Sequence, residues 1–415
     1  MTAYNGRMYI KRDITKQLTD SASWIQVLLG PRQCGKSTLF ASLLVAGKDN
    51  NSFKEITFDD LQMRQLANQD PALFLQQFEP PLLLDEVQYA PNLFPELKKI
   101  IDQIKRAAVF HPDSKQPSKV LFRLTGSNQI LMDKNIKESL AGRASYYHLN
   151  TLTVHEIIRA LPNTKIQEIL FKGGWPELYT NTSLSVTNYL NDYIRTYVEK
   201  DIILSAGIQK TSEFLTVLRL CAARTAQETD YTDIHKDSGV SAVTIKEWMG
   251  VLERADLIYQ LKPYFNNLNK RLIKRPKLYF LDTGLATRLQ GWSEAAPLLN
   301  SPQIGGLFET LVLAEIVKFI RNYGKDWELF FARTKDDDEV DFIIKTAQGK
   351  MYAIEAKYAI HGITRAISLP PAFQKELGGT VSLAVVTSGG QKMQLSAHCI
   401  TVPIVELHDY LNEII

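Results

Sequence analysis

The hydrophobic pattern of the first part of the chain alternates between short apolar runs and amphipathic stretches. The apolar runs that predict strands lie at residues 24–29, 56–58, 82–84 and 120–125. A glycine-containing loop at 30–37 follows the first run, and a helical pattern begins at Thr38. Strands that alternate with helices predict an α/β domain with a mostly parallel sheet.

The pattern changes after this domain. Residues 150–211 are mostly helical by pattern, with one strong turn, GGWP, at 173–176. Residues 231–259 read as a helix, a turn at Gly239, a second helix and a strand. This order matches a winged helix in outline. The apolar spacing of this stretch comes from Val240, Val243, Trp248 and Leu252.

A second alternation of strands and helices fills the end of the chain. The strands are expected at 278–282, 328–332, 339–345, 352–357 and 382–387, with helices at 307–320 and after Val405. A length of 415 residues agrees with several cores rather than one. The four expected parts are an α/β core at 1–149, a helical lid at 150–211, a winged-helix-like part at 212–265 and a second α/β domain at 266–415.

Composition narrows the class of protein. Apolar residues make up 45% and charged residues 22%, as in soluble globular chains, and a net charge of +3 favours no particular partner. Cys34, Cys221 and Cys399 are few and far apart, which argues against a disulfide framework. The start of the chain has no apolar signal segment, and no apolar run approaches about 18 residues. A cytoplasmic protein without a membrane segment is therefore expected.

The loop after the first strand carries the strongest chemical signal. It reads GPRQCGKST, which fits the phosphate-binding pattern GxxxxGK[ST]. Backbone N–H groups and the following helix N-terminus would face phosphate oxygens. Lys36 would reach the β- and γ-phosphates of ATP, and the Ser37 hydroxyl would bind Mg²⁺. The expected nucleotide-binding residues are Gly30, Pro31, Arg32, Gln33, Cys34, Gly35, Lys36, Ser37 and Thr38.

A second motif strengthens this prediction against a chance glycine loop. The apolar strand at 82–84 ends in Asp85 and Glu86, which would hold Mg²⁺ and polarise the attacking water. The bland interpretation is a solvated strand end. The next strand ends in LTGSN, whose Ser127 or Asn128 could orient the same water.

Arg143, in LAGR, is a candidate for the group that neutralises γ-phosphate charge. It could act in cis, or across a subunit boundary of a homo-oligomer as an arginine finger. An ordinary salt bridge explains a single arginine equally well.

The last domain carries a set of carboxylates and a lysine. Asp341 lies in EVDF, and Glu355 and Lys357 lie in EAK on the following strand. Because strand side chains alternate, Glu355 and Lys357 share a face, and Asp341 on the neighbouring strand can approach them. Glu309, on the preceding helix, could complete the set.

These groups suit metal-dependent phosphodiester cleavage. Two carboxylates and a carbonyl would hold Mg²⁺, and Lys357 would position or deprotonate a metal-bound water. The expected metal ligands here are Glu309, Asp341 and Glu355. A surface ion pair at 355–357 and a retained but inactive cluster are the alternatives.

Taken together, these motifs resemble a bacterial and archaeal ATPase family. That family joins an AAA+-like P-loop domain to a winged helix and a C-terminal domain of previously unknown function, DUF4143. The resemblance covers nearly the whole chain. It rests on GPRQCGKST, FDD, LLLDEVQ, LTGSNQ, SLAGR, GGWPE, YFLDTGL, GLFE, EVDF and EAK, in that order.

The resemblance implies ATP binding, slow hydrolysis and a C-terminal domain like the PD-(D/E)xK nuclease fold. The positions that match the nuclease motif are Glu309, Asp341, Glu355 and Lys357, with Val340 in place of the proline of the namesake motif. The expected fold is a P-loop NTPase domain with a helical lid, a winged helix and a C-terminal restriction-endonuclease-like α/β domain. The GGWPE motif is expected to have a structural role.

Three functions fit these features. The first is an ATP-regulated enzyme that acts on DNA, with contacts from residues 262–277, which hold six Lys or Arg and two aromatic residues. A solvated linker is the bland interpretation of that strip. The second function is an ATPase switch or assembly protein whose nuclease-like domain is inactive and binds a protein partner. The third, a small-molecule kinase, is least favoured because no acceptor site is evident.

Overall fold

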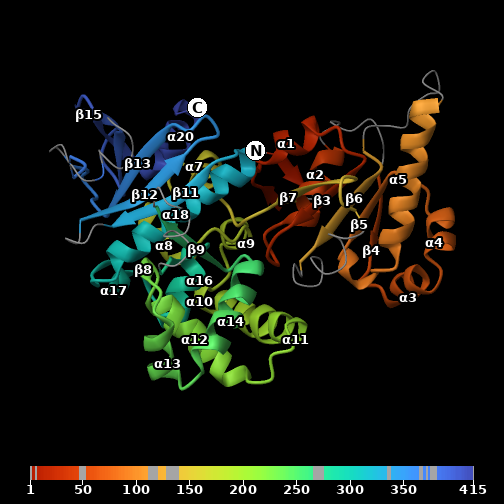
Figure 1. Cartoon of the computed structure of the whole chain (residues 1–415), viewed down its shortest axis with the longest axis horizontal. Helices are drawn as coiled ribbons and strands as arrows, with labels where there is room; N and C mark the ends of the chain where they lie inside the picture. The colour runs from red at the N-terminus through yellow and green to blue at the C-terminus, as the bar shows by residue number, and fades with distance from the viewer. Residues whose placement is uncertain are drawn as a thin grey trace. The chain divides into compact units, whose positions relative to one another are not determined.

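The computed structural model describes residues 2–4, 7–45, 53–110, 120–127, 140–264, 275–333, 338–363, 368–370, 373 and 381–414. The chain forms two compact units (Figure 1). The N-terminal unit contains Thr2–Asn150 and Asp201–Gly207, and the C-terminal unit contains Thr151–Lys200 and Ile208–Ile415. None of the helices in the described residues is both long and apolar enough to span a bilayer.

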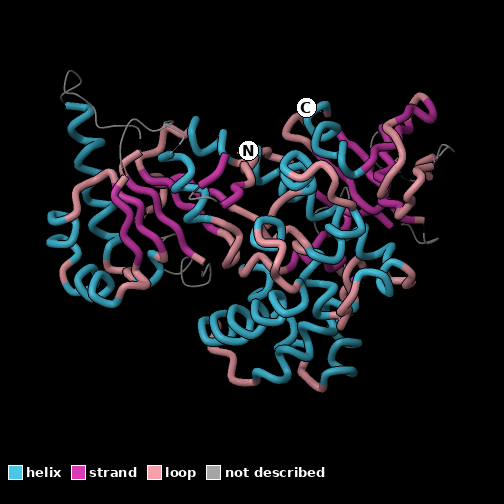
Figure 2. The backbone as a smooth tube through the Cα atoms, turned by 180° about the vertical axis from the view of Figure 1, so that it is seen from behind, coloured by secondary structure: helices cyan, strands magenta, loops and turns pink. Residues whose placement is uncertain are grey.

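A five-stranded parallel sheet forms the centre of the N-terminal unit (Figure 2). Its strand order is β4-β5-β6-β3-β7, with β3 at Ile25–Leu29, β4 at Lys54–Thr57, β5 at Leu82–Asp85, β6 at Phe122–Gly126 and β7 at Ala144–His148. The apolar runs predicted four of these strands. β7 was not predicted, because its sequence ASYYH is only half-buried and lacks an apolar run.

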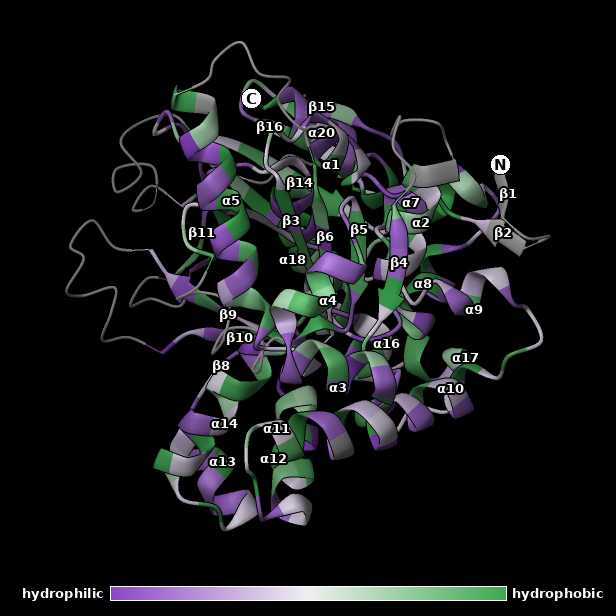
Figure 3. Cartoon of the chain, turned by 90° about the vertical axis from the view of Figure 1, so that its right-hand side faces the viewer, coloured by the Kyte–Doolittle hydropathy of each residue, from purple (hydrophilic) through white to green (hydrophobic). Residues whose placement is uncertain are grey.

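Alternating residues of the sheet pack against helices on opposite faces. Val27 lies in a buried cluster with Phe94 and Leu97 of α5, whereas the adjacent Leu28 packs with Leu39 and Phe40 of α2. The hydropathy colouring in Figure 3 shows hydrophilic and hydrophobic bands along α5, as expected for a helix with one buried face. The elements outside the sheet are β1 Thr2–Tyr4, β2 Arg7–Tyr9, α1 Thr15–Asp20, α2 Lys36–Val45, α3 Leu61–Gln69, α4 Pro71–Gln77, η1 Val87–Tyr89 and α5 Leu93–Phe110.

The C-terminal unit is built on a mixed sheet of nine strands in the order β15-β16-β14-β13-β12-β11-β9-β10-β8. Buried residues of β12, β13 and β14, among them Ile343, Ala353 and Val385, share one core cluster. No strand was predicted at β15 or β16. The strands are β8 Gln227–Glu228, β9 Ile258–Pro263, β10 Lys277–Phe280, β11 Glu328–Arg333, β12 Glu339–Lys345, β13 Met351–Lys357, β14 Ser382–Thr387, β15 Met393–Ser396 and β16 Cys399–Pro403.

Helices supply the rest of this part of the chain, and one stretch, Ile194–Ile202, is a π-helix labelled η2. The last residues of η2 and the short α11 at Ile203–Ser205 belong by their contacts to the N-terminal unit. The other helices are α7 Val154–Ala160, α8 Ile166–Lys172, α9 Glu177–Thr180, α10 Val186–Tyr193, α12 Thr211–Ala223, α13 Tyr231–Ser238, α14 Ala242–Arg254, α16 Thr283–Leu289, α17 Ala295–Leu299, α18 Ile304–Tyr323, η3 Ile404–Glu406 and α20 Leu407–Glu413.

The middle of the chain has the element order α12, β8, α13, α14, β9, β10, with β10 antiparallel to both β9 and β8. Gly239, with φ 72°, ends α13. The prediction of an apolar face was correct for Trp248 and Leu252 but wrong for Val243, which is 71% exposed. The expected boundary at 265–266 falls between the paired strands β9 and β10, and the four-part division of the chain stays a prediction.

Two sequence motifs, GGWPE and LDTG, form one structural joint. The Asp282 carboxylate accepts hydrogen bonds from the N–H groups of Gly174 (2.9 Å) and Leu285 (3.1 Å). Gly173 has φ 70°, and a Cβ there would lie 2.0 Å from Asp282 Oδ1. Trp175 is buried against Tyr193. These contacts agree with the structural role that was expected for the motif.

Candidate functional sites

The loop of residues 30–35 connects β3 to α2 in a backbone conformation that its glycines permit. Gly30 has φ 147° and Gly35 has φ 94°. A Cβ on Gly30 would lie 2.1 Å from the carbonyl oxygen of Leu149, so no side chain fits there. Gln33 adopts φ 61°, and its side chain is exposed. The loop therefore has the strand-to-helix setting that the phosphate-binding motif requires.

A buried arginine that the sequence did not indicate supports this loop from behind. Arg12 is 4% exposed, and its guanidinium donates to the carbonyl oxygens of Cys34 (2.8 Å) and Asn150 (2.6 Å). The Cys34 thiol is buried and donates to the Leu149 carbonyl at 3.3 Å. The side chain of Cys34 thus holds the loop, and only its backbone remains a candidate for nucleotide contact.

Lys36 begins α2, and its ammonium group lies within the loop. It is 6% exposed, and its Nζ donates to the carbonyl oxygens of Gly30 (3.0 Å) and Pro31 (2.8 Å). The positive charge is therefore held at the concave side of the loop, beside the N-terminus of α2.

The two nucleotide motifs meet at Ser37 and Asp85. Ser37 Oγ donates to Asp85 Oδ1 at 2.9 Å, and the Thr125 hydroxyl donates to the same oxygen. A hydroxyl and a carboxylate oxygen this close are hard-oxygen donors of the kind that Mg²⁺ prefers. Ser37 and Asp85 are the residues that would hold the ion, and Thr125 orients Asp85.

Glu86 follows β5 in the left-handed region, with φ 55° and ψ 43°. Its Oε2 accepts hydrogen bonds from the Ser127 hydroxyl (2.8 Å) and the Ser127 N–H (3.3 Å), and also from Gln88. Strained non-glycine backbone of this kind is common at functional sites. The structure places Ser127 beside Glu86, as the sequence analysis expected, whereas Asn128 lies outside the described residues.

Arg32 adds a positive charge at the same end of the loop. Its Nε forms an ion pair with Asp201 Oδ2 at 2.8 Å and lies 3.4 Å from Ser127 Oγ. Burial alone would lower the pKa of Arg32, but the nearby Asp201 and Glu86 outweigh burial and raise it. Asp201 follows the loop by many residues, and no local sequence signal marked it.

Arg143 forms a two-pronged ion pair with Asp102 of α5. Its Nε and Nη2 lie 2.7 Å and 2.9 Å from the two carboxylate oxygens, and its Nη1 donates to the Ala141 carbonyl. The hydrogen bond from Arg143 lowers the pKa of Asp102. Within this chain, Arg143 thus forms an ordinary salt bridge, which was the non-catalytic alternative for this residue.

The carboxylates of the C-terminal unit lie on neighbouring elements. Antiparallel pairing of β12 with β13 opposes Phe342 to Ile354, and the next opposed positions are Asp341 and Glu355. Asp341 Oδ2 accepts the Ala356 N–H at 2.8 Å, and Lys357 Nζ lies 3.0 Å from Glu355 Oε2. Asp341 and Glu355 are 8% and 7% exposed, so neither carboxylate belongs to a surface ion pair.

Glu309 of α18 is held by two residues of β10 that the sequence analysis missed. Its Oε1 accepts hydrogen bonds from the Tyr279 hydroxyl (2.6 Å) and from Lys277 Nζ (3.0 Å). Lys277 also pairs with Glu339. Lys277 was expected to be part of a DNA-binding strip at 262–277. The structure corrects this for Lys277, because its side chain is 4% exposed and its charge is paired with Glu309 and Glu339. Residues 265–274 of the strip lie outside the described residues.

The charge of this cluster, which we call the acidic cluster, is not balanced. Burial, together with the charge of Asp341, raises the pKa of both Glu309 and Glu355 to about 7. With every group ionised, four carboxylates (−4) face two ammonium groups (+2), a formal charge of −2 that one divalent cation would match. The groups are Glu309, Glu339, Asp341, Glu355, Lys277 and Lys357.

The geometry fits a divalent ion only in part. The ligand oxygens of Glu309, Asp341 and Glu355, all within the described residues, do not come within 4.8 Å of one another as a set of three. Asp341 and Glu355, on adjacent strands, are therefore the two acids best placed to share an ion. Glu309 is held instead by Tyr279 and Lys277.

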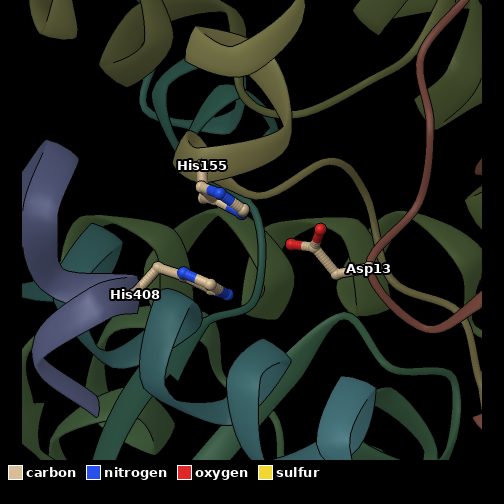
Figure 4. Close-up of side chains that lie close together, drawn as sticks. All are labelled: Asp13, His155 and His408. Carbon is tan, nitrogen blue, oxygen red and sulfur yellow. The ribbon is translucent and has the colours of Figure 1, made fainter. Parts of the chain in front are cut away.

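Two histidines of the C-terminal unit stack on each other (Figure 4). The rings of His155 and His408 have centroids 3.7 Å apart and planes inclined by 7°. His408 is also hydrogen-bonded to the Tyr323 hydroxyl at 2.7 Å and to Asp409 at 2.9 Å. The stack joins α7 to α20, and no sequence pattern predicted it.

Three family models match successive parts of the chain. Residues 23–158 match the AAA domain family, residues 163–296 match a domain of unknown function, DUF8612, and residues 304–407 match a domain of unknown function, DUF4143. An uncharacterized protein of Mycobacterium tuberculosis is 28% identical over 385 residues, covering 91% of this chain and 80% of the relative. An uncharacterized protein of Haemophilus influenzae is 23% identical over 368 residues, covering 83% and 84%.

Solved structures give weaker similarities. A Walker-type ATPase of Pyrococcus abyssi matches with a TM-score of 0.40 and 15% identity, covering 68% of this chain and 96% of that one. The ORC2 protein of Aeropyrum pernix matches with a TM-score of 0.37 and 13% identity, covering 71% and 96%. Scores this low carry no argument about function. The family matches show an AAA-type P-loop domain at residues 23–158 and a DUF4143 domain at residues 304–407.

Proposed function

We propose that this protein binds ATP with Mg²⁺ at residues 30–38 and hydrolyses it. The observation that carries the proposal is the meeting of the two motifs: Ser37 Oγ lies 2.9 Å from Asp85 Oδ1, with Glu86 next in the chain. A P-loop without a catalytic carboxylate would suit binding alone. The carboxylate and hydroxyl of Glu86 and Ser127 add the groups that hydrolysis needs.

The roles of the residues follow from their positions. Backbone N–H groups of the loop would donate to phosphate oxygens, and Lys36 would exchange its two carbonyl partners for the β- and γ-phosphates. Ser37 and Asp85 would hold Mg²⁺, which neutralises phosphate charge when bound. Glu86, fixed by Ser127, would accept a proton from the attacking water or orient it.

The test is to compare Glu86→Gln with wild type, measuring ATP affinity and turnover separately. Gln keeps the shape of the side chain but cannot act as a base, so turnover should fall by about 10²-fold or more with little change in affinity. A matched exchange at the exposed Glu413 controls for loss of one carboxylate. Equal turnover in wild type and Glu86→Gln would contradict the proposal that ATP is hydrolysed at this site with the help of Glu86.

We further propose that the acidic cluster binds a divalent cation and that the C-terminal domain acts on DNA as a nuclease. The cluster's formal charge of −2 and its buried Asp341 and Glu355 support metal binding. The element order α12, β8, α13, α14, β9, β10 is compatible with the winged helix expected from the sequence, and such a module would supply contact with DNA. Lys357, 47% exposed at the side chain, would reach the reacting water.

The test is cleavage of single- and double-stranded DNA with Mg²⁺ or Mn²⁺, with and without ATP. Wild type is compared with Glu355→Ala and with Glu413→Ala, whose carboxylate is exposed and outside the cluster. Cleavage that Glu355→Ala alone removes would assign the nuclease site. Equal cleavage by both variants would point to a contaminating nuclease.

A second function has an observation in its favour. Lys277 already gives Glu309 and Glu339 a cation, so part of the cluster is neutralised without a metal. An ATPase switch whose C-terminal domain binds a protein partner would retain such a cluster for stability alone. No Mn²⁺ binding by wild type, measured by electron paramagnetic resonance, would favour this second function. Binding that requires Asp341 and Glu355 would favour the nuclease.

A further inference from the structure

The guanidinium group of Arg32, in the phosphate loop, has not yet been given a role in ATP binding or hydrolysis. Arg32 lies at the end of the loop where Glu86 and Ser127 meet: its Nε is 3.4 Å from Ser127 Oγ, and that hydroxyl lies 2.8 Å from Glu86 Oε2. These are the groups proposed to hold the attacking water. A cation here would face the terminal phosphate rather than the nucleoside end of a bound nucleotide.

The side chain of Arg32 is more exposed than that of Arg143, the other candidate arginine. Both oxygens of Asp102 hold the Arg143 side chain, which is 25% exposed, whereas the closest contact of Arg32 with Asp201 is that of Nε with Oδ2 at 2.8 Å. The Arg32 side chain is 36% exposed, so water reaches it and it has room to turn. Surface ion pairs of this kind are weak, and a more highly charged anion can replace the carboxylate.

The partner of Arg32 lies in an unusual element. Asp201 belongs to the π-helix η2 at Ile194–Ile202. π-helical turns are rare and occur frequently at functional sites. By their contacts, residues 201–207 belong to the N-terminal unit, while the chain on both sides of them belongs to the C-terminal unit. The ion pair therefore attaches residues 201–207 to the phosphate loop. The chain before and after these residues belongs to the C-terminal unit.

We propose that Arg32 distinguishes a nucleoside triphosphate from a diphosphate, and that the terminal phosphate and Asp201 compete for its guanidinium. The inference rests on the proposed ATP binding at this loop. A triphosphate brings charge to the Glu86 end of the site, takes Arg32 from Asp201 and frees residues 201–207 from the loop. A diphosphate ends short of that point and leaves the ion pair intact.

The first experiment measures the affinity of ADP and of a non-hydrolysable ATP analogue by calorimetry. The chains compared are wild type, Arg32→Ala, Arg32→Lys and Asp201→Asn. Because hydrogen bonds between charged groups are among the stronger ones, Arg32→Ala should bind the analogue roughly tenfold or more weakly and ADP nearly as wild type. Asp201→Asn removes the competitor, so it should bind the analogue several-fold more tightly. Arg32→Lys should recover part of the preference.

Arg195→Ala serves as the matched control. Arg195 lies in the same π-helix, is 70% exposed and pairs with Asp192 three residues before it. It should leave both affinities unchanged. The thermal midpoint of every variant is measured first, and Arg32→Lys carries the test if Arg32→Ala fails to fold.

The second experiment follows hydrogen exchange of the peptide that contains residues 201–207. Wild type should exchange faster there with the ATP analogue than with ADP, and Arg32→Ala should show no difference. Weaker analogue binding by Asp201→Asn, or a wild-type preference in Arg32→Ala, would overturn this inference while leaving ATP binding in place. Failure of wild type to bind either nucleotide would overturn both.

Discussion

At the scale of single residues, the phosphate site depends on contacts between motifs that are far apart in the chain. Ser37 from the loop and Thr125 from β6 both donate to Asp85 of β5. The carboxylate is therefore fixed before any ion arrives. Such preorganisation lowers the cost of assembling the site when a ligand binds.

The phosphate-site assignment predicts the effect of Lys36→Ala. The loss of the ammonium group that contacts the β- and γ-phosphates should abolish ATP hydrolysis and weaken ATP binding by tenfold or more. Steady-state phosphate release and calorimetry measure the two effects. Lys99→Ala, on the exposed face of α5, is the control. Undiminished turnover in Lys36→Ala would show that the site lies elsewhere.

A role of Arg143 in ATP turnover can be separated from its role in the ion pair with Asp102. If Arg143 acts on the γ-phosphate in trans, Arg143→Ala should slow turnover with little change in nucleotide affinity, and turnover should depend on protein concentration. Asp102→Asn keeps the arginine but removes its anionic partner. Identical losses in stability and activity for both variants would mean that Arg143 serves only the ion pair with Asp102.

The acidic cluster predicts how stability depends on pH without metal. Glu355 has an ordinary pKa near 4.5 and a folded-state pKa of about 7, so the folded protein binds more protons than the unfolded chain between these values. The free energy of unfolding should therefore fall as the pH rises from about 4.5 to 7, by at most roughly 3 kcal/mol for one such group. Denaturant unfolding at each pH measures it.

Two controls accompany that prediction. Glu355→Gln should reduce the dependence between pH 4.5 and 7, with Glu309 supplying the rest, whereas the exposed Glu413→Gln should leave it unchanged. Mn²⁺ or Mg²⁺ that binds the cluster should restore stability at the upper end of the range. Stability that rises with pH across this window would contradict a raised pKa of the buried Glu355 carboxyl group.

At the scale of elements, β10 and the turn before α9 connect motifs that the sequence shows only as separate signatures. β10 brings Lys277 and Tyr279 to the helix residue Glu309. Asp282, just after β10, caps α16 and holds the Gly174 turn. A single short strand thus supports both the acidic cluster and the joint formed by GGWPE and LDTG.

The joint predicts a stability loss for Asp282→Ala. The change would leave the N–H groups of Gly174 and Leu285 without their acceptor in a buried position, at a cost of about 2–4 kcal/mol. Urea unfolding measures it. Asp282→Asn keeps one acceptor oxygen and should cost less. Asp230→Ala, which removes the cap of the exposed helix α13, should cost about 1 kcal/mol.

At the scale of the whole molecule, the chain joins a nucleotide domain to a domain with a separate candidate site. The segment 201–207, which Arg32 holds through Asp201, is where the chain passes from one compact unit to the other and back. Any effect of ATP on the acidic cluster or on DNA must appear as a coupling free energy between two sites.

This coupling predicts a closed thermodynamic cycle. If ATP changes the affinity for DNA, DNA must change the affinity for ATP by the same factor. Fluorescence anisotropy of labelled DNA, with and without a non-hydrolysable ATP analogue, gives one side, and calorimetry gives the other. Lys36→Ala should remove the effect of the nucleotide on DNA. Equal DNA affinities with and without the analogue would show that the two domains work independently.

The sequence by itself determined the parts of this protein whose residues are close together in the chain. The P-loop, the strand ending in Asp85 and Glu86, and the alternation that predicts an α/β P-loop fold were all read correctly, because they depend on local spacing. Strands without an apolar run, such as β7 and β15, were missed, since only pairing with a neighbouring strand fixes them.

Only the tertiary structure decided which distant side chains meet. Lys277 looked like a member of a basic surface strip, but folding buries it against Glu309 and Glu339. Asp201 and Asp102 gave no signal, yet they are the partners of the two candidate arginines, Arg32 and Arg143. Ion pairs form wherever the fold brings opposite charges together, and that distance in space is not encoded by the spacing of residues along the chain.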